Sequence, residues 1–185
     1  MAGCGDHGTD ADSIDGTGGP RPLFHTSHAR HLEFVPAFGE WLGPCEPALR
    51  GSGSLRFSLF IDDGEILRTE TEFEDARCQD TNLVQTTAYD LNQVNRRPLG
   101  PGSDTFDAST HVTFVQLRIA PRYGAIANLR RLCGIMDWRD GEQRRVDGAP
   151  CAPYVTPASG TPIGQSFVVD GAGLSADGRR YQRVR

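Results

Sequence analysis

The sequence predicts an all-β protein built around one antiparallel barrel. The chain has 185 residues with 22 glycines and 12 prolines, and its apolar residues occur in short runs rather than in long helical stripes. This length accommodates one sizeable domain and a tail. Several turn-bounded strands at this spacing are typical of a barrel or a sandwich.

A β-hairpin over residues 54–74 is the clearest single element. In SLRFSLFI (54–61), apolar side chains occupy every second position, and an Asp-Gly turn follows at 62–64. In EILRTETEFE (65–74), the alternation places Leu67, Thr69, Thr71 and Phe73 on one face and Arg68, Glu70, Glu72 and Glu74 on the other. We expect the second face to point outward, so that its carboxylates keep the barrel soluble.

Other segments predict the remaining strands and one helix. Strand candidates are 83–91, 111–120, a segment near 135–138, 167–171 and 179–184. Between them, YGAIANLRRLC (123–133) carries Ile126, Leu129 and Leu132 at helical spacing. This stretch predicts one short helix lying against the sheet.

A barrel of about eight antiparallel strands has room for one small ligand. The side chains expected to point inward, and therefore the candidate ligand-binding residues, are Phe57, Leu59, Thr69, Thr71, Phe73, Thr87 and Tyr89. Ordinary core packing is the alternative role for the same residues, because apolar strand faces are usually filled rather than hollow.

The first part of the chain predicts a tether. Residues 1–33 are interpreted as a flexible polar segment and residues 34–185 as a single barrel domain, since Ile14 is the only large aliphatic residue between Met1 and Leu23. His25, His28 and His31 recur at every third position, but this spacing alone does not make a metal site. We expect a polar approach to the first strand and no bound metal.

Four of the five cysteines fall within the predicted domain. They allow three pairings, and the local sequence units favour Cys45 with Cys78 and Cys133 with Cys151. Disulfides in these positions would stabilise a modest barrel by roughly 3–4 kcal/mol each. They would also indicate an extracytoplasmic compartment.

Composition and motifs argue against several classes of function. The formal net charge is −5 and the arginine pairs are scattered, so we expect no nucleic-acid partner. No apolar run approaches the roughly 20 residues of a membrane-spanning helix. Common nucleophile, phosphate-binding, zinc-protease and dinucleotide motifs are absent, and His111 has no evident catalytic partner. We therefore expect a protein that is not an enzyme, with no catalytic residues and no cofactor.

Ala2, Gly3 and Cys4 resemble the end of a bacterial lipobox. The resemblance implies that Cys4 carries lipid chains, which would give stable membrane anchoring through the lipid alone. Gly5 behind the cysteine implies sorting to the outer membrane. The expected location is the bacterial cell envelope, with the barrel anchored to the outer membrane and either periplasmic or exposed at the surface.

The segments FGEWLGPC, EDARCQD, LCGIMDW and VVDGAGL, spread over residues 38–174, resemble a group of bacterial lipocalin-like lipoproteins of unassigned role. Gly39, Glu40 and Trp41 fit the Gly-x-Trp signature of lipocalins. The resemblance implies that Trp41 closes the barrel floor and that Arg183 from the last strand covers it with a cation–π contact.

Two functions follow as alternatives from this sequence. One is a lipid-anchored envelope barrel that binds a small apolar or amphipathic ligand. The other is a filled barrel that serves as an accessory or docking subunit of a larger envelope protein complex.

Overall fold

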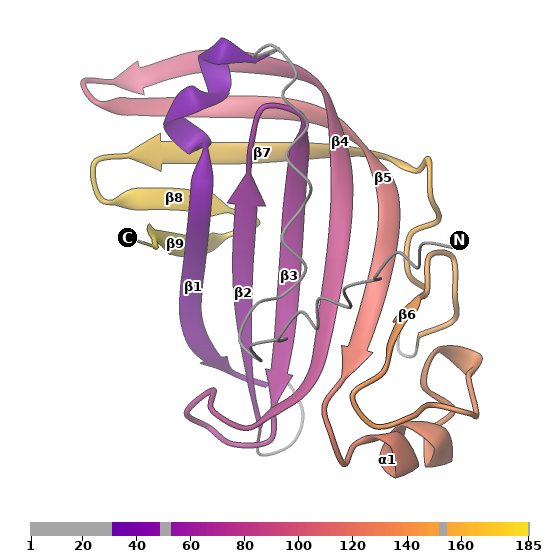
Figure 1. The fold of residues 1–185 in the computed structure, drawn as a ribbon. Helices are drawn as coiled ribbons and strands as arrows, with labels where there is room; N and C mark the ends of the chain where they lie inside the picture. Colours follow the sequence, from indigo (N-terminus) through magenta and orange to yellow (C-terminus); the bar gives the residue numbers. More distant parts are fainter. Residues whose placement is uncertain (1–30, 49–52, 152–154, 185) are drawn as a thin grey trace, which may run out of the picture.

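The computed structural model describes residues 31–48, 53–151 and 155–184, which form an all-β barrel with one short α-helix (Figure 1). The elements in chain order are the 3-10 helix η1 (Leu32–Ala37), β1 (Gly39–Pro47), β2 (Ser54–Ile61), β3 (Glu65–Phe73), β4 (Thr81–Gly100), β5 (Ser103–Ile119), α1 (Gly124–Leu129), the 3-10 helix η2 (Leu132–Gly134), β6 (Gln143–Arg145), β7 (Pro162–Asp170), β8 (Gly173–Ala176) and β9 (Arg179–Arg183).

Eight of these strands close into an antiparallel up-and-down barrel. The order around the sheet is β4-β3-β2-β1-β9-β8-β7-β5, and β5 pairs with β4 to complete the circle. The last strand returns to the first where Trp41 pairs with Arg183 and Leu42 with Gln182. The short strand β6 pairs with the C-terminal part of β5. The predicted fold class is confirmed, and the architecture is compatible with that of lipocalins.

The long strands β4 and β5 bend, which lets one pair of strands serve both halves of the barrel. In Figure 1 the lower part of β4 runs beside β3, while the upper part of β5 turns to run beside β7. The register between them shifts between Ala88 and Tyr89 and again between Leu91 and Gln93. Extra residues of this kind bend a strand and increase its twist, which is how the sheet curves enough to close.

Most of the predicted strands are present, with longer bounds than expected for β4 and β5. The strand predicted near 135–138 is wrong. Residues 135–138 belong to no strand, and directly before them Cys133 and Gly134 adopt left-handed backbone angles, with φ of 55° and 75°, which interrupt an extended conformation. Strand β1 was not predicted because a register shift between Leu42 and Cys45 interrupts its alternation.

One end of the barrel is closed by η1. Phe34 is fully buried, and its ring centroid lies 5.2 Å from that of Phe106 and 5.5 Å from that of Phe167. His31, which precedes η1, is also buried, and its ring nitrogen Nε2 lies 3.3 Å from the carbonyl oxygen of Leu91. The rest of the predicted tether, residues 1–30, lies outside the described residues.

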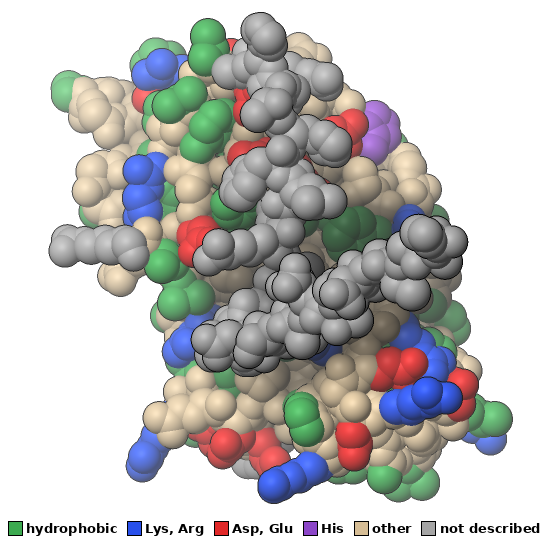
Figure 2. Space-filling model, in the orientation of Figure 1, with side chains coloured by type: hydrophobic (Ala, Val, Ile, Leu, Met, Phe, Trp, Pro, Cys, Tyr) green, Lys and Arg blue, Asp and Glu red, His purple; other side chains and the backbone are tan. Residues whose placement is uncertain are grey.

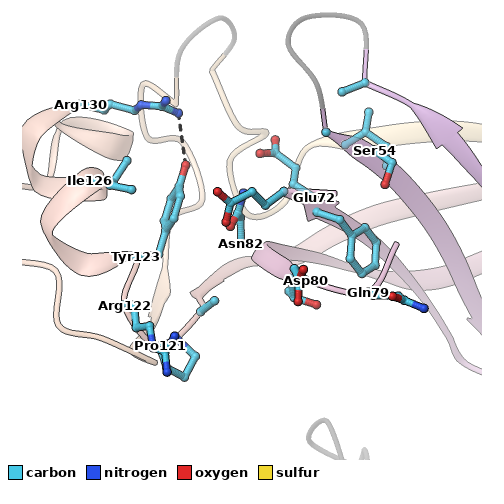
Figure 3. A pocket seen from close by; sticks show the side chains of 17 residues that line it. Ser54, Glu72, Gln79, Asp80, Asn82, Pro121, Arg122, Tyr123, Ile126 and Arg130 are labelled. Carbon is cyan, nitrogen blue, oxygen red and sulfur yellow. Dashed lines mark hydrogen bonds between the residues drawn. The ribbon is translucent and has the colours of Figure 1, made fainter. Parts of the chain in front are cut away.

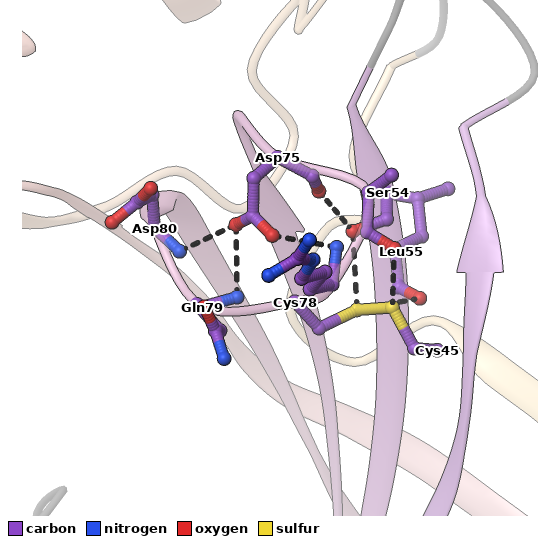
Figure 4. The surroundings of a disulfide bond; sticks show 9 residues. Cys45, Ser54, Leu55, Asp75, Cys78, Gln79 and Asp80 are labelled. Carbon is purple, nitrogen blue, oxygen red and sulfur yellow. Dashed lines mark hydrogen bonds between the residues drawn. A yellow bond between two sulfur atoms is a disulfide. The ribbon is translucent and has the colours of Figure 1, made fainter.

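Both predicted disulfides, Cys45–Cys78 and Cys133–Cys151, are present. The first ties β1 to the loop between β3 and β4, and Figure 4 shows Asp75 organising that loop. The Asp75 carboxylate accepts hydrogen bonds from the backbone N–H groups of Arg77, Gln79 and Asp80 at 2.5–2.9 Å. These bonds, that of Asp80 foremost, hold the pKa of Asp75 below its ordinary value.

The two disulfides indicate an oxidising compartment, extracellular or periplasmic. In the part of the chain that the structure describes, no helix has both the length and the apolar character needed to cross a bilayer.

Candidate functional site

The interior of the barrel carries one apolar strand directly beside one charged strand. The register pairs Leu55 with Glu72, Phe57 with Glu70 and Leu59 with Arg68 across β2 and β3. Paired residues of neighbouring strands share a face of the sheet. Because Phe57 and Leu59 are buried in the core, the three charged partners on β3 also lie on the inner face.

This arrangement overturns the prediction that Glu70 and Glu72 point outward and that Thr69 and Thr71 point inward. Thr69 pairs with Ser58 and Thr71 with Arg56, both on the outer face of β2. The hydroxyl groups of Thr69 and Thr86 lie 3.3 Å apart on that same outer face. Thr69 and Thr71 therefore do not line the interior.

The length of the turn explains the error. The backbone N–H of Asp62 donates to the carbonyl oxygen of Glu65 at 3.0 Å, and Ile61 pairs with Ile66. Four residues separate Ile61 from Ile66, so odd-numbered residues of β2 pair with even-numbered residues of β3. The alternation in β3 predicted the two faces correctly, and the pairing of Ile61 with Ile66 decides which of them is the inner face.

The other candidate interior residues have different outcomes. Phe57, Leu59, Thr87 and Tyr89 are on the inner face, where Thr87 pairs with Arg68 and Tyr89 with Ile66. Phe73 follows a register shift after Glu72 and lies at the end of the barrel away from η1. The geometry thus brings four of the seven candidates together on the inner wall and puts Phe73 at the rim.

Two ion pairs lie beside Phe57: one joins β3 to the turn between β8 and β9, and the other joins the neighbouring strands β9 and β1. The Arg68 guanidinium lies 2.6 Å from the Asp177 carboxylate, in the turn between β8 and β9. The Arg179 guanidinium lies 3.2 Å from the carboxylate of Glu46 on β1. Both guanidinium groups approach the Phe57 ring, at 5.6 Å and 3.9 Å from its centroid. Cation–π contacts of this kind add to the ion pairs in joining the two parts of the barrel.

Tyr181 on β9 is close enough to these charges to be affected by them, and it is fully buried. Its hydroxyl group has no hydrogen-bond partner among the described residues. Burial raises the pKa of the Tyr181 phenol, and the charges of Arg68 and Arg179 partly oppose the rise. An unpartnered hydroxyl in this position costs free energy unless another molecule supplies a partner.

Glu70 and Glu72 are half-buried carboxylates on the same wall. Burial raises the pKa of Glu70, although Arg68 and Arg179 oppose the rise. Burial also raises the pKa of Glu72, the negative charge of Glu70 raises it further, and Arg130 opposes the rise. The sequence analysis expected both side chains on the outer face and therefore did not identify them as interior residues.

A partly open cavity of about 1470 Å³ lies at the end of the barrel opposite η1 (Figure 3). On one side it is lined by the ends of β2, β3 and β4, including Leu55, Glu72 and Phe73, and on the other by Tyr123, Ile126 and neighbouring residues of the α1 region. In Figure 2 acidic and basic side chains stand side by side along the lower edge of the molecule, where α1 and the barrel mouth lie. The cavity combines apolar walls with charged groups, as ligand sites commonly do.

The closed end contains the residues predicted for the barrel floor. Trp41 is 3 % exposed, and its indole N–H donates to the carbonyl oxygen of Ala37 at 2.7 Å. The Arg183 guanidinium lies 4.7 Å from the centroid of the Trp41 ring and donates to the carbonyl oxygens of Pro36 and Phe38 at 3.1 Å and 2.8 Å. The predicted cation–π contact is therefore present, and it fixes η1 across the barrel end.

The remaining candidates from the sequence are Cys4, the histidines and a possible metal site. Cys4, His25 and His28 lie outside the described residues. Within residues 31–48, 53–151 and 155–184, no group of three or more His, Cys, Asp or Glu side chains is arranged to hold a metal ion. His111 lies on β5, exposed, with its ring nitrogen Nδ1 against the Asn92 amide.

No protein-family model matches the chain, and no curated protein is significantly similar to it in sequence.

Proposed function

We propose that this protein is a lipid-anchored, lipocalin-like barrel of the bacterial cell envelope that binds a small apolar or amphipathic ligand without catalysing a reaction. The ligand enters at the end of the barrel opposite η1. The protein holds it by shape, apolar contact and a few polar groups, and needs no cofactor.

The cavity at the barrel mouth is the observation that carries this proposal. Its volume of about 1470 Å³ exceeds that of a typical small-molecule site, and Leu55 and Phe73 give it apolar surface. The opposite end is closed by η1, Trp41 and Arg183, so the entrance for a ligand is this mouth, and we call the mouth with its cavity the cup. A cup with an apolar and polar wall suits binding better than a filled barrel does.

The envelope location rests on two features of the chain. The two disulfides fit a protein that folds in an oxidising compartment. The Ala2-Gly3-Cys4 sequence supplies the lipobox resemblance and an attachment point ahead of the barrel. Multiple acyl chains on Cys4 would hold the protein at the membrane surface.

Exposed apolar side chains at the closed end favour the alternative, a docking subunit of an envelope protein complex. Leu32 and Val35 on η1 are 67 % and 48 % exposed, and Leu42 on β1 and Val184, directly after β9, are exposed as well. Apolar surface of this kind often marks a contact with another protein.

Native mass spectrometry of the protein purified from its own membrane tests both functions in one measurement. Ligand binding predicts a mass increment of a few hundred daltons that is lost on denaturation, together with the acyl mass on Cys4. A stoichiometric protein partner with no small molecule would support the docking function instead. A bare polypeptide mass, without lipid, ligand or partner, would contradict both.

A further inference from the structure

We propose that the ligand of this cup is an amphipathic organic cation whose ammonium group pairs with the carboxylate of Glu72, which lines the cavity, and is attracted also by Glu70, the next inner-face carboxylate along β3. This inference rests on the proposed function and names the chemical class that the interior selects. Three independent features of the inner wall support it.

The first feature is the balance of charge inside the barrel. The two inner arginines, Arg68 and Arg179, are already paired with Asp177 and Glu46. Within the described residues, neither Glu70 nor Glu72 has an ion-pair partner within 4.0 Å. The interior therefore holds two surplus negative charges, on side chains that are roughly 7 Å apart along one strand.

The free-energy cost of burying these two carboxylates favours a cationic partner. Both carboxylates are half-buried, and burial raises the pKa of each. A carboxylate removed from water is destabilised unless an opposite charge or hydrogen-bond donor replaces the water. An ammonium group entering between Glu70 and Glu72 would supply both and would form charge-assisted hydrogen bonds.

Tyr181 supplies the second feature. Its hydroxyl is buried, lacks a partner in the described part of the chain, and lies on the inner face near the Arg68 and Arg179 charges that also act on Glu70. A phenol hydroxyl can accept a hydrogen bond from an ammonium N–H. Tyr181 does not line the cavity, but the interior behind Glu72 thus holds a further carboxylate and an unused acceptor.

The third feature is the apolar surface beside the carboxylates. Leu55 pairs with Glu72 across the strands, and Phe73, Tyr123 and Ile126 line the same cavity. A hydrocarbon or aromatic body could lie against this surface while its charged end reaches the carboxylates. The cavity is large enough for such a molecule and opens toward solvent.

The arginines at the cavity do not reverse this selection. Arg122 and Arg130 line its outer wall and are exposed, and Arg130 donates to the Tyr123 hydroxyl at 3.2 Å. Exposed charges are screened by water and salt and contribute little to binding. The less solvated carboxylates therefore decide which sign of charge the cup prefers.

The test compares three probes with the same ten-carbon chain, namely decylammonium, decan-1-ol and decanoate. Each is titrated calorimetrically into the full chain at neutral pH and below its aggregation concentration. We expect decylammonium to bind about tenfold or more tightly than decanoate, since hydrogen bonds to charged groups are the strong ones. Decan-1-ol should lie between the two.

Matched variants test whether Glu70 and Glu72 cause the preference for decylammonium. Glu72→Gln and Glu70→Gln keep the side-chain shape and should each weaken decylammonium binding about tenfold while changing decan-1-ol binding by less than about twofold. Glu40→Gln changes an exposed carboxylate on the outer face of β1 and should leave all three affinities unchanged. Unfolding curves establish that each variant is folded.

The outcomes separate this inference from the proposed function. If all three probes bind with similar affinity, or if decylammonium binding survives both glutamine variants, the cup binds ligands but does not select a cation, and this inference is wrong. If no probe binds to the folded parent protein, the proposed function and this inference both fail.

Discussion

Glu70 of β3 lies directly opposite Phe57 of β2 on the inner face of the barrel, so that a carboxylate and a phenyl ring share one layer of the interior. Two arginines, Arg68 and Arg179, flank the same ring and neutralise other carboxylates. The interior is therefore neither a plain apolar core nor a water-filled channel. Its stability depends on the protonation of the surplus carboxylates, which can be measured.

Glu72→Gln should stabilise the protein at neutral pH and have little effect at pH 4. The raised pKa of Glu72 means that the folded state holds its proton more tightly than the unfolded state, whose pKa is 4.5. Stability is therefore lost as the pH rises from about 4.5 through the raised folded pKa. Arg130 opposes this loss and Glu70 increases it. Urea unfolding of parent and variant at several pH values measures the difference.

Glu40→Gln is the control for that experiment, because Glu40 is exposed on the outer face. Its unfolding midpoint should follow that of the parent at every pH. A Glu72→Gln variant that is less stable than the parent at pH 7 would show that the carboxylate is stabilised inside the barrel, contrary to the argument from burial.

Tyr181→Phe should raise the free energy of unfolding of the ligand-free protein by about 1–3 kcal/mol, the usual cost of a buried polar group without a partner. The phenyl ring would keep the contacts of Tyr181, including its approach to Gly43, while the unpartnered hydroxyl is removed. Chemical denaturation measures the change. A clear loss of stability in the variant would mean that the hydroxyl has a partner in solution, such as a bound water.

Trp41→Ala should lower the free energy of unfolding by about 3–5 kcal/mol, which is typical of deleting a large buried aromatic side chain. The mutation also removes the indole donor to Ala37 and the surface under Arg183. Arg183→Ala should cost less, since its side chain is exposed. An unchanged denaturation midpoint in Trp41→Ala would show that the floor contributes nothing to the barrel.

The Cys45–Cys78 and Cys133–Cys151 bonds should each appear as a linked peptide in non-reducing peptide mapping. They close loops of 33 and 18 residues, so removing them by double Cys→Ser changes should cost about 4 and about 3 kcal/mol on the chain-entropy model. Free thiols at all four positions in protein from its own cell envelope would contradict both the pairing and the compartment.

Cys4→Ser should move the protein from the membrane fraction to the soluble envelope fraction when a signal peptide precedes the chain. Lipid attached to Cys4 would be the only anchor in this proposal, so the loss of one sulfur atom removes membrane binding. Radiolabelled palmitate should enter the parent and not the variant. A variant that stays at the membrane would instead indicate a protein partner and favour the docking function.

Several features could be predicted because they depend on short-range patterns. Two-residue alternation identified the hairpin of β2 and β3, and the Gly-x-Trp resemblance correctly predicted that Arg183 contacts Trp41. The disulfide pairing followed from cysteines that bracket local units. Strand β1 escaped prediction because its bulge between Leu42 and Cys45 breaks the alternation on which such predictions depend.

The sequence by itself determined that β3 has one threonine-bearing face and one charged face, since alternation is a local property of an extended chain. Only the tertiary structure decided which face is inside. The Ile61–Ile66 pairing sets the register, and closure of β9 onto β1 brings Arg179 and Tyr181 to the same interior. Charged residues can occupy an inner face when distant strands supply their partners, and the pairing of Arg68 with Asp177, 109 residues away, exists only in the closed barrel.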